Sequence, residues 1–281
     1  RQAIPRGPLV QALLAGLEPG GDALADPYRK FSGGHWRLLS LADLRFPPGD
    51  RRLRPAIDVE LGWAMTRGTQ ARLVNGLHRH CASQEGNALA AACRLGFGAD
   101  PRVSELVDRL GAWQWPDGGW NCDKRPVATH SSFHESLAPL RGLVDYRRMS
   151  GRGDLDDVIA AAAEMFLRAG LFRTRQRREV IHPSFLRLRY PPYWHYNVLA
   201  GLVVLTDAGL VGDPRTAEAL DVVESKRLPD GRFRVEGAWW ASINGSRYPE
   251  AAPWGRSGPN QMVTLHALRV LRAAGRLDLA A

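Results

Sequence analysis

Side chains that can act as acids, bases or metal ligands gather in four short segments of this 281-residue sequence. The segments cover residues 78–87, 130–136, 193–197 and 260–261, and they are rich in histidine, glutamate and asparagine. Six of the eight histidines lie in these segments or within one turn of them. Histidine titrates near neutral pH, and burial raises the pKa of a glutamate toward neutrality. The segments therefore indicate general acid–base catalysis.

We predict that four of these residues act as general acids and bases, namely Glu85, His134, Glu135 and His195. Aromatic and polar neighbours would bind the substrate. These predicted substrate-binding residues are His80, Asn87, Trp120, Tyr193, Trp194, Tyr196, Asn197, Trp240, Trp254, Asn260 and Gln261. This acid–base hypothesis requires no cofactor.

A divalent metal that activates water is the alternative chemistry, and zinc is the metal that histidine and cysteine ligands favour. Its ligands would come from His130, His134, His195 and Cys122. The chain has three cysteines and no Cys-x-x-Cys pair, so the sequence indicates neither a disulfide framework nor a zinc knuckle.

An internal repeat organises the chain around these segments. The triplet Asp-Pro-Arg at 100–102 recurs at 213–215, and weaker copies of the repeat contain Asp50 and Asp156 in the same slot. The four aspartates are spaced by 50, 56 and 57 residues, which leaves room for two helices and a loop in each copy. Asp followed by Pro is typical of a helix N-cap and first helical position.

Within each copy, a helix that is apolar on nearly all sides precedes an amphipathic helix. This alternation predicts an all-α fold, a single α/α toroid of about five helical hairpins with an inner and an outer ring of helices. The toroid would span residues 35–276, between an N-terminal segment at 1–34 and a tail at 277–281. The aromatic, Gly-rich and Pro-rich stretch at 231–259 predicts a long C-terminal loop or hairpin.

Aligning the copies on their inner helices places Asn87, Glu135 and Asn197 in one slot. Pro139 is tolerated near a helix start, so we expect His134 and Glu135 to flank a helix N-terminus. In a toroid the inner helices are parallel, and their N-termini meet at one rim of the cavity. We therefore predict that the polar segments converge on that rim, where helix dipoles shift pKa values.

The sequence Gln-Trp-Pro-Asp-Gly-Gly-Trp at 114–120 resembles the QW motif of the squalene-hopene cyclase and protein prenyltransferase superfamily. In that family the glutamine caps a neighbouring helix and the tryptophan stacks on it. The resemblance, which with the repeat covers about residues 35–276, implies a short, single-domain terpenoid cyclase-like toroid. It also implies an enzyme that acts on an isoprenoid or other hydrophobic substrate in a central cavity.

The sequence departs from the family at its catalytic motifs. Class II terpene cyclases use a DxDD motif, and residues 154–157 spell DLDD, but they occupy the slot of Asp100 and Asp213 at the start of an outer helix. Acidic residues in a first helical turn favour capping, so we expect no DxDD catalysis by Asp154, Asp156 and Asp157. The prenyltransferase zinc pair Asp-x-Cys and the class I motif DDxxD are also missing from the sequence.

Composition limits the choice of partners. The formal net charge is +9, from 38 Lys plus Arg against 29 Asp plus Glu, but the basic residues are dispersed, so we expect no nucleic-acid binding. The sequence shows no apolar run long enough to span a bilayer and no secretory signal, and we expect a cytoplasmic protein. The arginine-rich segment at 173–179 would allow peripheral contact with an anionic membrane. A metal-dependent hydrolase or lyase and a non-catalytic lipid- or peptide-binding module remain the alternative functions.

Overall fold

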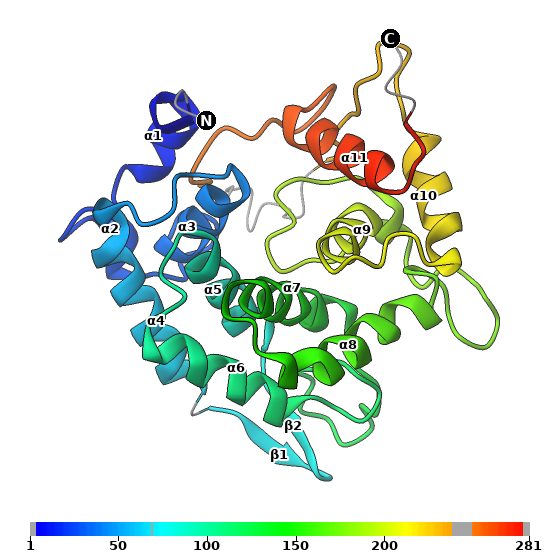
Figure 1. Ribbon diagram of the computed structural model, residues 1–281, viewed down its shortest axis with the longest axis horizontal. Coiled ribbons are helices and arrows are strands. Elements are labelled where there is room, and N and C mark those ends of the chain that lie inside the picture. The colour runs from blue at the N-terminus through cyan, green and yellow to red at the C-terminus, as the bar shows by residue number, and fades with distance from the viewer. Residues whose placement is uncertain (1–3, 69, 238–248, 278–281) are drawn as a thin grey trace. The chain divides into compact units, whose positions relative to one another are not determined.

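The computed structural model describes residues 4–68, 70–237 and 249–277, and these are mostly helical (Figure 1). The α-helices are α1 (Pro8–Leu14), α2 (Asp22–Ala25), α3 (Gly34–Asp43), α4 (Arg54–Gly68), α5 (Ser83–Arg94), α6 (Pro101–Trp113), α7 (Phe133–Ser150), α8 (Asp156–Arg168), α9 (Val198–Asp207), α10 (Ala217–Glu224) and α11 (Gln261–Ala273). Short 3₁₀ helices cover Ile4–Arg6, Arg51–Leu53, Gly153–Leu155, Pro183–Leu186 and Pro214–Thr216. The predicted all-α class is confirmed.

One small antiparallel hairpin, which was not predicted from the sequence, interrupts the helices. Strands β1 (Arg72–Val74) and β2 (Leu77–Arg79) are joined by Asn75 and Gly76, which both have positive φ. Asn-Gly is the preferred pair for such a tight turn, because both positions require the left-handed region. The predicted C-terminal loop contains only isolated bridges in its described part, such as Arg234 with Pro259.

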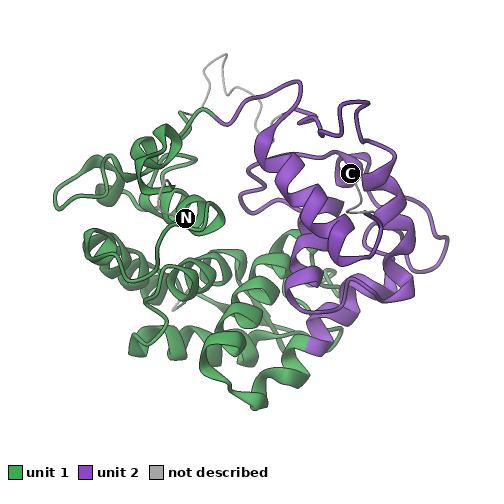
Figure 2. Ribbon diagram, turned by 45° about the horizontal axis from the view of Figure 1, so that its top comes forward, with its two compact units in different colours: residues 1–159, 242–253 green, residues 160–241, 254–281 purple. Residues whose placement is uncertain are grey.

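The chain divides into two compact units (Figure 2). Unit 1 comprises Arg1–Ile159 and Ser242–Pro253, and unit 2 comprises Ala160–Ala241 and Trp254–Ala281. Each unit contains helices of both predicted kinds. A single closed toroid over 35–276 remains a prediction.

Helices α5 and α7 form the centre of unit 1, and among the described elements they make the most extensive contact (Figure 1). All residues of α5 from Ser83 to Ala92 are buried, as expected for an inner helix. The two helices approach at Gly86, where an added Cβ would lie 2.3 Å from the backbone nitrogen of Pro139. Pro139 has no N–H, and Gly86 has no side chain, so the two backbones can meet directly.

Helices α5 and α7 run in the same direction. Near their N-termini, the Ser83 amide donates a hydrogen bond of 3.1 Å to Glu135 Oε2. Near their C-termini, Arg94 Nε donates to Asp145 Oδ2 at 2.5 Å, and Arg94 also lies 3.8 Å from Asp43 at the end of α3. Neighbouring parallel helices are what an inner ring requires. As expected, Glu135 lies in the first turn of its helix, which Ser132 caps.

In three of the four slots where the repeat places an aspartate, the aspartate caps a helix, whereas Asp156 is the first residue of α8 and pairs with Arg147. Asp50, Asp100 and Asp213 each accept a hydrogen bond from the backbone amide two residues further on. The DLDD residues lie at the start of α8, where Asp154 and Asp156 are exposed and pair with arginines.

The QW-like residues fasten helices together in unit 1. Gln114 Nε2 donates hydrogen bonds to Gly118 O at 2.8 Å and to Val158 O in the first turn of α8 at 2.9 Å. Trp120 is 1% exposed, and its indole Nε1 donates to Leu110 O of α6 at 2.9 Å. These bonds connect α6, the following loop and α8.

In unit 2, helix α9 packs against α10 and α11. Asn197 caps α9 and Asn260 caps α11 through their side-chain oxygens. The phenol of Tyr196 is completely buried and donates a hydrogen bond to Leu171 O at 2.7 Å. None of the helices in the described ranges is long and apolar enough to cross a membrane.

Candidate functional site

The candidate site of unit 1 forms where two loops run side by side. Arg79, the last residue of β2, pairs with Asn121 in a parallel bridge, and the His80 amide donates to Asn121 O at 3.2 Å. This pairing places the residues after the hairpin beside the residues after the QW-like motif. Cys81 and Cys122 therefore meet, although they are far apart in the sequence.

Both thiols lie next to the carboxylate of Glu135, and we call these three residues the dithiol–carboxylate cluster. One ligand atom from each residue can be chosen so that all three lie within 4.8 Å of one another. Cys122 Sγ lies 3.6 Å from Glu135 Oε1, and both cysteines are free thiols. Each residue comes from a different part of unit 1: the turn before α5, the loop after the QW-like motif, and the first turn of α7.

The electrostatics of the cluster distinguish its three members. Burial raises the pKa of Glu135, although the Ser83 amide stabilises the charged carboxylate. A hydrogen bond from Cys122 lowers the pKa of Cys81, and the positive charge of Arg67 acts in the same direction. The same hydrogen bond raises the pKa of Cys122. Cys81 is thus the sulfur of the pair that loses its proton more readily.

A buried His–Glu pair lies beside the cluster. His80 Nε2 and Glu85 Oε1 are 2.6 Å apart, and both side chains are almost completely buried. Within the described part of the chain, Glu85 Oε2 has no hydrogen-bond partner. A positive charge on His80 would lower the pKa of Glu135, and the carboxylate of Glu85 raises the pKa of Cys81. Glu85, predicted as catalytic, and His80, predicted as substrate-binding, are partners of each other.

A second buried His–Glu pair was not predicted from the sequence. His35 Nδ1 in α3 lies 2.7 Å from Glu60 Oε1 in α4, and neither side chain is more than 2% exposed. Tyr28 packs edge-on against His35 and stacks on Trp63, with ring centroids 5.0 Å apart in both contacts. Burial raises the pKa of Tyr28, and a hydrogen bond with Gln84 opposes this effect. The negative charges of Glu135, Cys81 and Glu60 raise the pKa of the phenol further. Tyr28 therefore connects the second pair to the cluster.

The signal that identifies His35 was present in the sequence. His35, Glu85 and Glu135 follow one another at intervals of 50 residues, and they lie in the first turns of α3, α5 and α7. The alignment that placed Asn87 opposite Glu135 was therefore wrong by two residues. Helices α5 and α7 begin at Ser83 and Phe133, and these starts equate Glu85 with Glu135.

Other predicted residues of unit 1 lie outside the cluster. Among the described residues, one group of side chains is close enough together to hold a metal ion, and this is the dithiol–carboxylate cluster. Of the predicted metal ligands only Cys122 belongs to it. His130 is exposed, and His134 is half-buried beside Glu135. Asn87 is buried, and its Nδ2 has no hydrogen-bond partner among the residues that the structure describes. Trp120 is buried, and its indole donates a hydrogen bond to Leu110 O of α6.

The remaining predicted residues belong to unit 2. His195 stacks on Trp194 with ring centroids 4.4 Å apart, and Tyr190 packs edge-on against Trp254. Tyr193 and Trp254 are buried, and Gln261 is exposed. Tyr196, Asn197 and Asn260 form the hydrogen bonds described above. Trp240 lies outside the described residues, and the convergence of both units on one rim remains a prediction.

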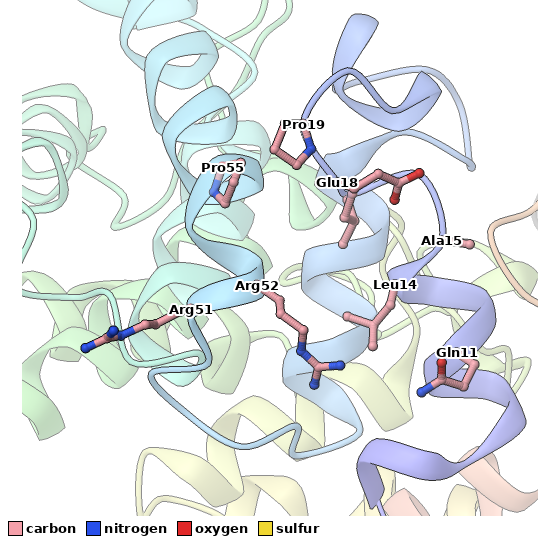
Figure 3. Close-up of a pocket in the computed structure, with 9 residues that line it drawn as sticks. Gln11, Leu14, Ala15, Glu18, Pro19, Arg51, Arg52 and Pro55 are labelled. Carbon is pink, nitrogen blue, oxygen red and sulfur yellow. The ribbon is translucent and has the colours of Figure 1, made fainter.

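A cavity of 460 Å³ lies elsewhere in unit 1, between α1 and the start of α4 (Figure 3). Its lining includes apolar Leu14 and Pro55 together with Glu18, Arg51 and Arg52. Arg52 is held by Asp50, which lies outside this lining: Nε donates to Oδ1 at 3.0 Å and Nη2 donates to Oδ2 at 2.7 Å. The cavity contains none of the residues of the cluster.

The sequence matches no protein-family model, and a search of curated proteins finds no match.

Proposed function

We propose that the chain is a zinc-dependent enzyme of the hydrolase or lyase class, with the metal bound by the dithiol–carboxylate cluster. The observation that supports this proposal is the mutual spacing of its ligand atoms, all within 4.8 Å, with Cys122 Sγ 3.6 Å from Glu135 Oε1. Zn–S bonds of about 2.3 Å and Zn–O bonds of about 2.0 to 2.2 Å in a tetrahedron separate sulfur and oxygen ligands by about 3.5 Å. Small side-chain adjustments would complete that geometry.

The ligand types favour zinc over harder cations. Thiolates select zinc and other soft metals, whereas magnesium and calcium bind oxygen ligands. Three protein ligands leave one tetrahedral position for water or substrate, which is typical of a catalytic rather than a structural zinc site. No fourth histidine, cysteine or carboxylate joins the cluster within the described ranges.

Zinc in such a site supplies a Lewis acid and lowers the pKa of bound water. The residues of the chain would orient the ligands and the substrate. The Ser83 amide holds Glu135 Oε2 and leaves Oε1 directed at Cys122. The phenol of Tyr28 keeps its proton over the physiological range, because its pKa is raised, and it can donate a hydrogen bond to a substrate.

A metal-free acid–base enzyme is the second candidate, and the raised pKa of Glu135 favours it. A buried, protonated carboxyl group can transfer a proton to an apolar substrate, which agrees with the hydrophobic substrate that the QW resemblance implies. This candidate uses Glu135 as an acid, whereas the zinc enzyme uses it as a ligand.

Metal analysis of protein purified without chelator or nickel resin separates the two candidates. We expect about one zinc per chain in the wild type, because three ligands from a folded site bind zinc tightly. Cys81→Ser and Cys122→Ser should reduce zinc to trace amounts. Cys93→Ser is the matched control and should retain the metal, because Cys93 lies near Arg94 and Asp145, outside the cluster.

Circular dichroism and thermal unfolding of each variant identify variants that fail to fold. If the folded wild type contains only trace zinc and takes up none when zinc is added, the zinc proposal is wrong. Glu135→Gln then tests the second candidate, which predicts loss of turnover with retained folding.

A further inference from the structure

One face of helix α4 lines the site beside the dithiol–carboxylate cluster. Glu60, Trp63 and Arg67 follow one another at intervals of three and four residues, so they lie on the same side of the helix. The contacts agree with this placement. Glu60 pairs with His35, Trp63 stacks on Tyr28, and Arg67 Nε donates to Gln84 Oε1 at 3.3 Å.

Arg67 is a half-buried cation next to the thiols. It reaches the cluster through Gln84, which accepts its hydrogen bond and whose backbone amide donates to Cys81 O at 2.9 Å. Within the described ranges no carboxylate lies within 4.0 Å of its guanidinium, and its hydrogen bond goes to the neutral amide of Gln84. Other half-buried arginines of unit 1 do have carboxylate partners, such as Arg102 with Asp100 and Arg109 with Glu105.

This arrangement leaves most guanidinium donors of Arg67 available to a ligand. A guanidinium has five N–H donors in a planar fork that fits a carboxylate in bidentate geometry. Partial burial strengthens such a pair compared with one in bulk water. One guanidinium balances the single negative charge of a carboxylate, but only half of the charge of a doubly charged phosphate.

An aromatic surface lies one turn away from this cation. The rings of Tyr28 and Trp63 are nearly parallel, with an interplanar angle of 15°, and both side chains keep part of their surface exposed. Trp36, which packs against the same Tyr28, is by contrast fully buried. Tyr28 and Trp63 can therefore contact the apolar body of a ligand whose carboxylate reaches Arg67.

We infer that the site binds an apolar monocarboxylate, with its anionic group on Arg67 and its hydrocarbon body on Tyr28 and Trp63. The inference rests on the proposed function, because it places this substrate beside the zinc ligands. It adds a substrate class, and it makes Arg67 a specificity residue for the anionic group.

Calorimetric titration of the zinc-loaded full chain with decanoate and with decanol tests this inference. Decanol has the same hydrocarbon chain without the charge. We expect the wild type to bind decanoate more tightly, and Arg67→Gln to weaken decanoate binding about tenfold or more, because a charge-assisted hydrogen bond is lost. Decanol binding should be unchanged by Arg67→Gln.

Arg51→Gln is the control variant. Arg51 is exposed and lines the separate cavity between α1 and α4, so the variant also reports decanoate bound there. Decanoate affinity should change less than about twofold in Arg51→Gln, as for other exposed side chains that are not in contact with the ligand. A loss of affinity in Arg51→Gln with none in Arg67→Gln would overturn the inference.

Equal affinity for decanoate and decanol, or no decanoate binding at all, would also overturn it. Zinc analysis of the same samples keeps the two proposals separate. If wild type and Arg67→Gln retain zinc while decanoate fails to bind, the zinc site stands and the substrate class is wrong. If zinc is absent but decanoate binding still depends on Arg67, the ligand site stands and the zinc enzyme is wrong.

Discussion

The carboxylate of Asp100 both caps helix α6 and forms an ion pair. Its Oδ1 accepts the Arg102 amide at 3.1 Å, and the Arg102 guanidinium returns to both carboxylate oxygens. Arg102 also donates to Asp58 Oδ1 of α4 at 2.7 Å, so the cap connects α6 to α4. Hydrogen bonding from Arg102 lowers the pKa of Asp100 below its ordinary value.

Substituting Asp100 tests this residue-scale account. Asp100→Ala should reduce the free energy of unfolding at pH 7 by about 1 to 2 kcal/mol, because the cap and the ion pair are both lost. Asp100→Asn keeps a cap acceptor but loses the charge, so its cost should be smaller. Urea unfolding of each variant at several pH values measures both effects.

The pH dependence has a definite sign. Because the folded pKa of Asp100 is depressed, the stability from its charge is complete above the ordinary value of 3.8 and is lost as pH falls through the folded pKa. The stability difference between wild type and Asp100→Asn should therefore begin to shrink below about pH 4. A difference that is the same at pH 7 and pH 3 would contradict the ion-pair account.

Single residues of the candidate site were only partly predictable. Glu85 and Glu135 stand out in the sequence because charged residues are rare in apolar helices. The approach of Cys81 to Cys122 depends on the parallel bridge between Arg79 and Asn121, which no local spacing rule contains. The two carboxylates can therefore be predicted from the local sequence, but the pair of cysteines beside Glu135 cannot.

At the scale of elements, the site depends on the close approach of α5 and α7. Gly86 and Gly142 lie where these helices meet, and a Cβ on Gly142 would lie 2.7 Å from Gly86 O. This approach brings the Ser83 amide within hydrogen-bonding distance of Glu135. Helix positions and caps follow from local sequence, but the identity of the neighbouring helix does not.

Gly86→Ala should disrupt this helix contact. Its Cβ would lie 2.3 Å from backbone atoms of Ala138 and Pro139, so the helices must move apart, at a cost of about 3 kcal/mol or more. We also expect weaker zinc binding, because Glu135 moves relative to Ser83. Thermal and urea unfolding, with zinc titration of the folded fraction, measure the two effects.

Gly62→Ala on α4 is the matched control. An added Cβ there meets no atom within 4 Å, so the higher helix propensity of alanine should stabilise the protein by up to about 1 kcal/mol. Equal effects of the two substitutions would show that the α5–α7 contact is not tight.

At the scale of the whole molecule, periodicity was the most informative signal. The repeat predicts the helix order and the aspartate caps, because each copy reuses the same local physics. It also contains the 50-residue spacing of His35, Glu85 and Glu135, once the helix starts are aligned correctly. Closure of a ring depends on contacts between copies that are distant in the sequence, and these have no signature in a single period. The net charge was of little use for predicting a binding partner, because arginines such as Arg102 and Arg173 form ion pairs with nearby carboxylates.

X-ray absorption spectroscopy at the zinc edge of the purified full chain tests the central claim most directly. The cluster predicts about two sulfur scatterers at about 2.3 Å and about two oxygen or nitrogen scatterers at about 2.0 to 2.2 Å. In Cys122→Ser the zinc signal should fall to trace, whereas Cys93→Ser should give the wild-type spectrum. A zinc shell without sulfur, or a folded protein that binds no zinc, would contradict the account.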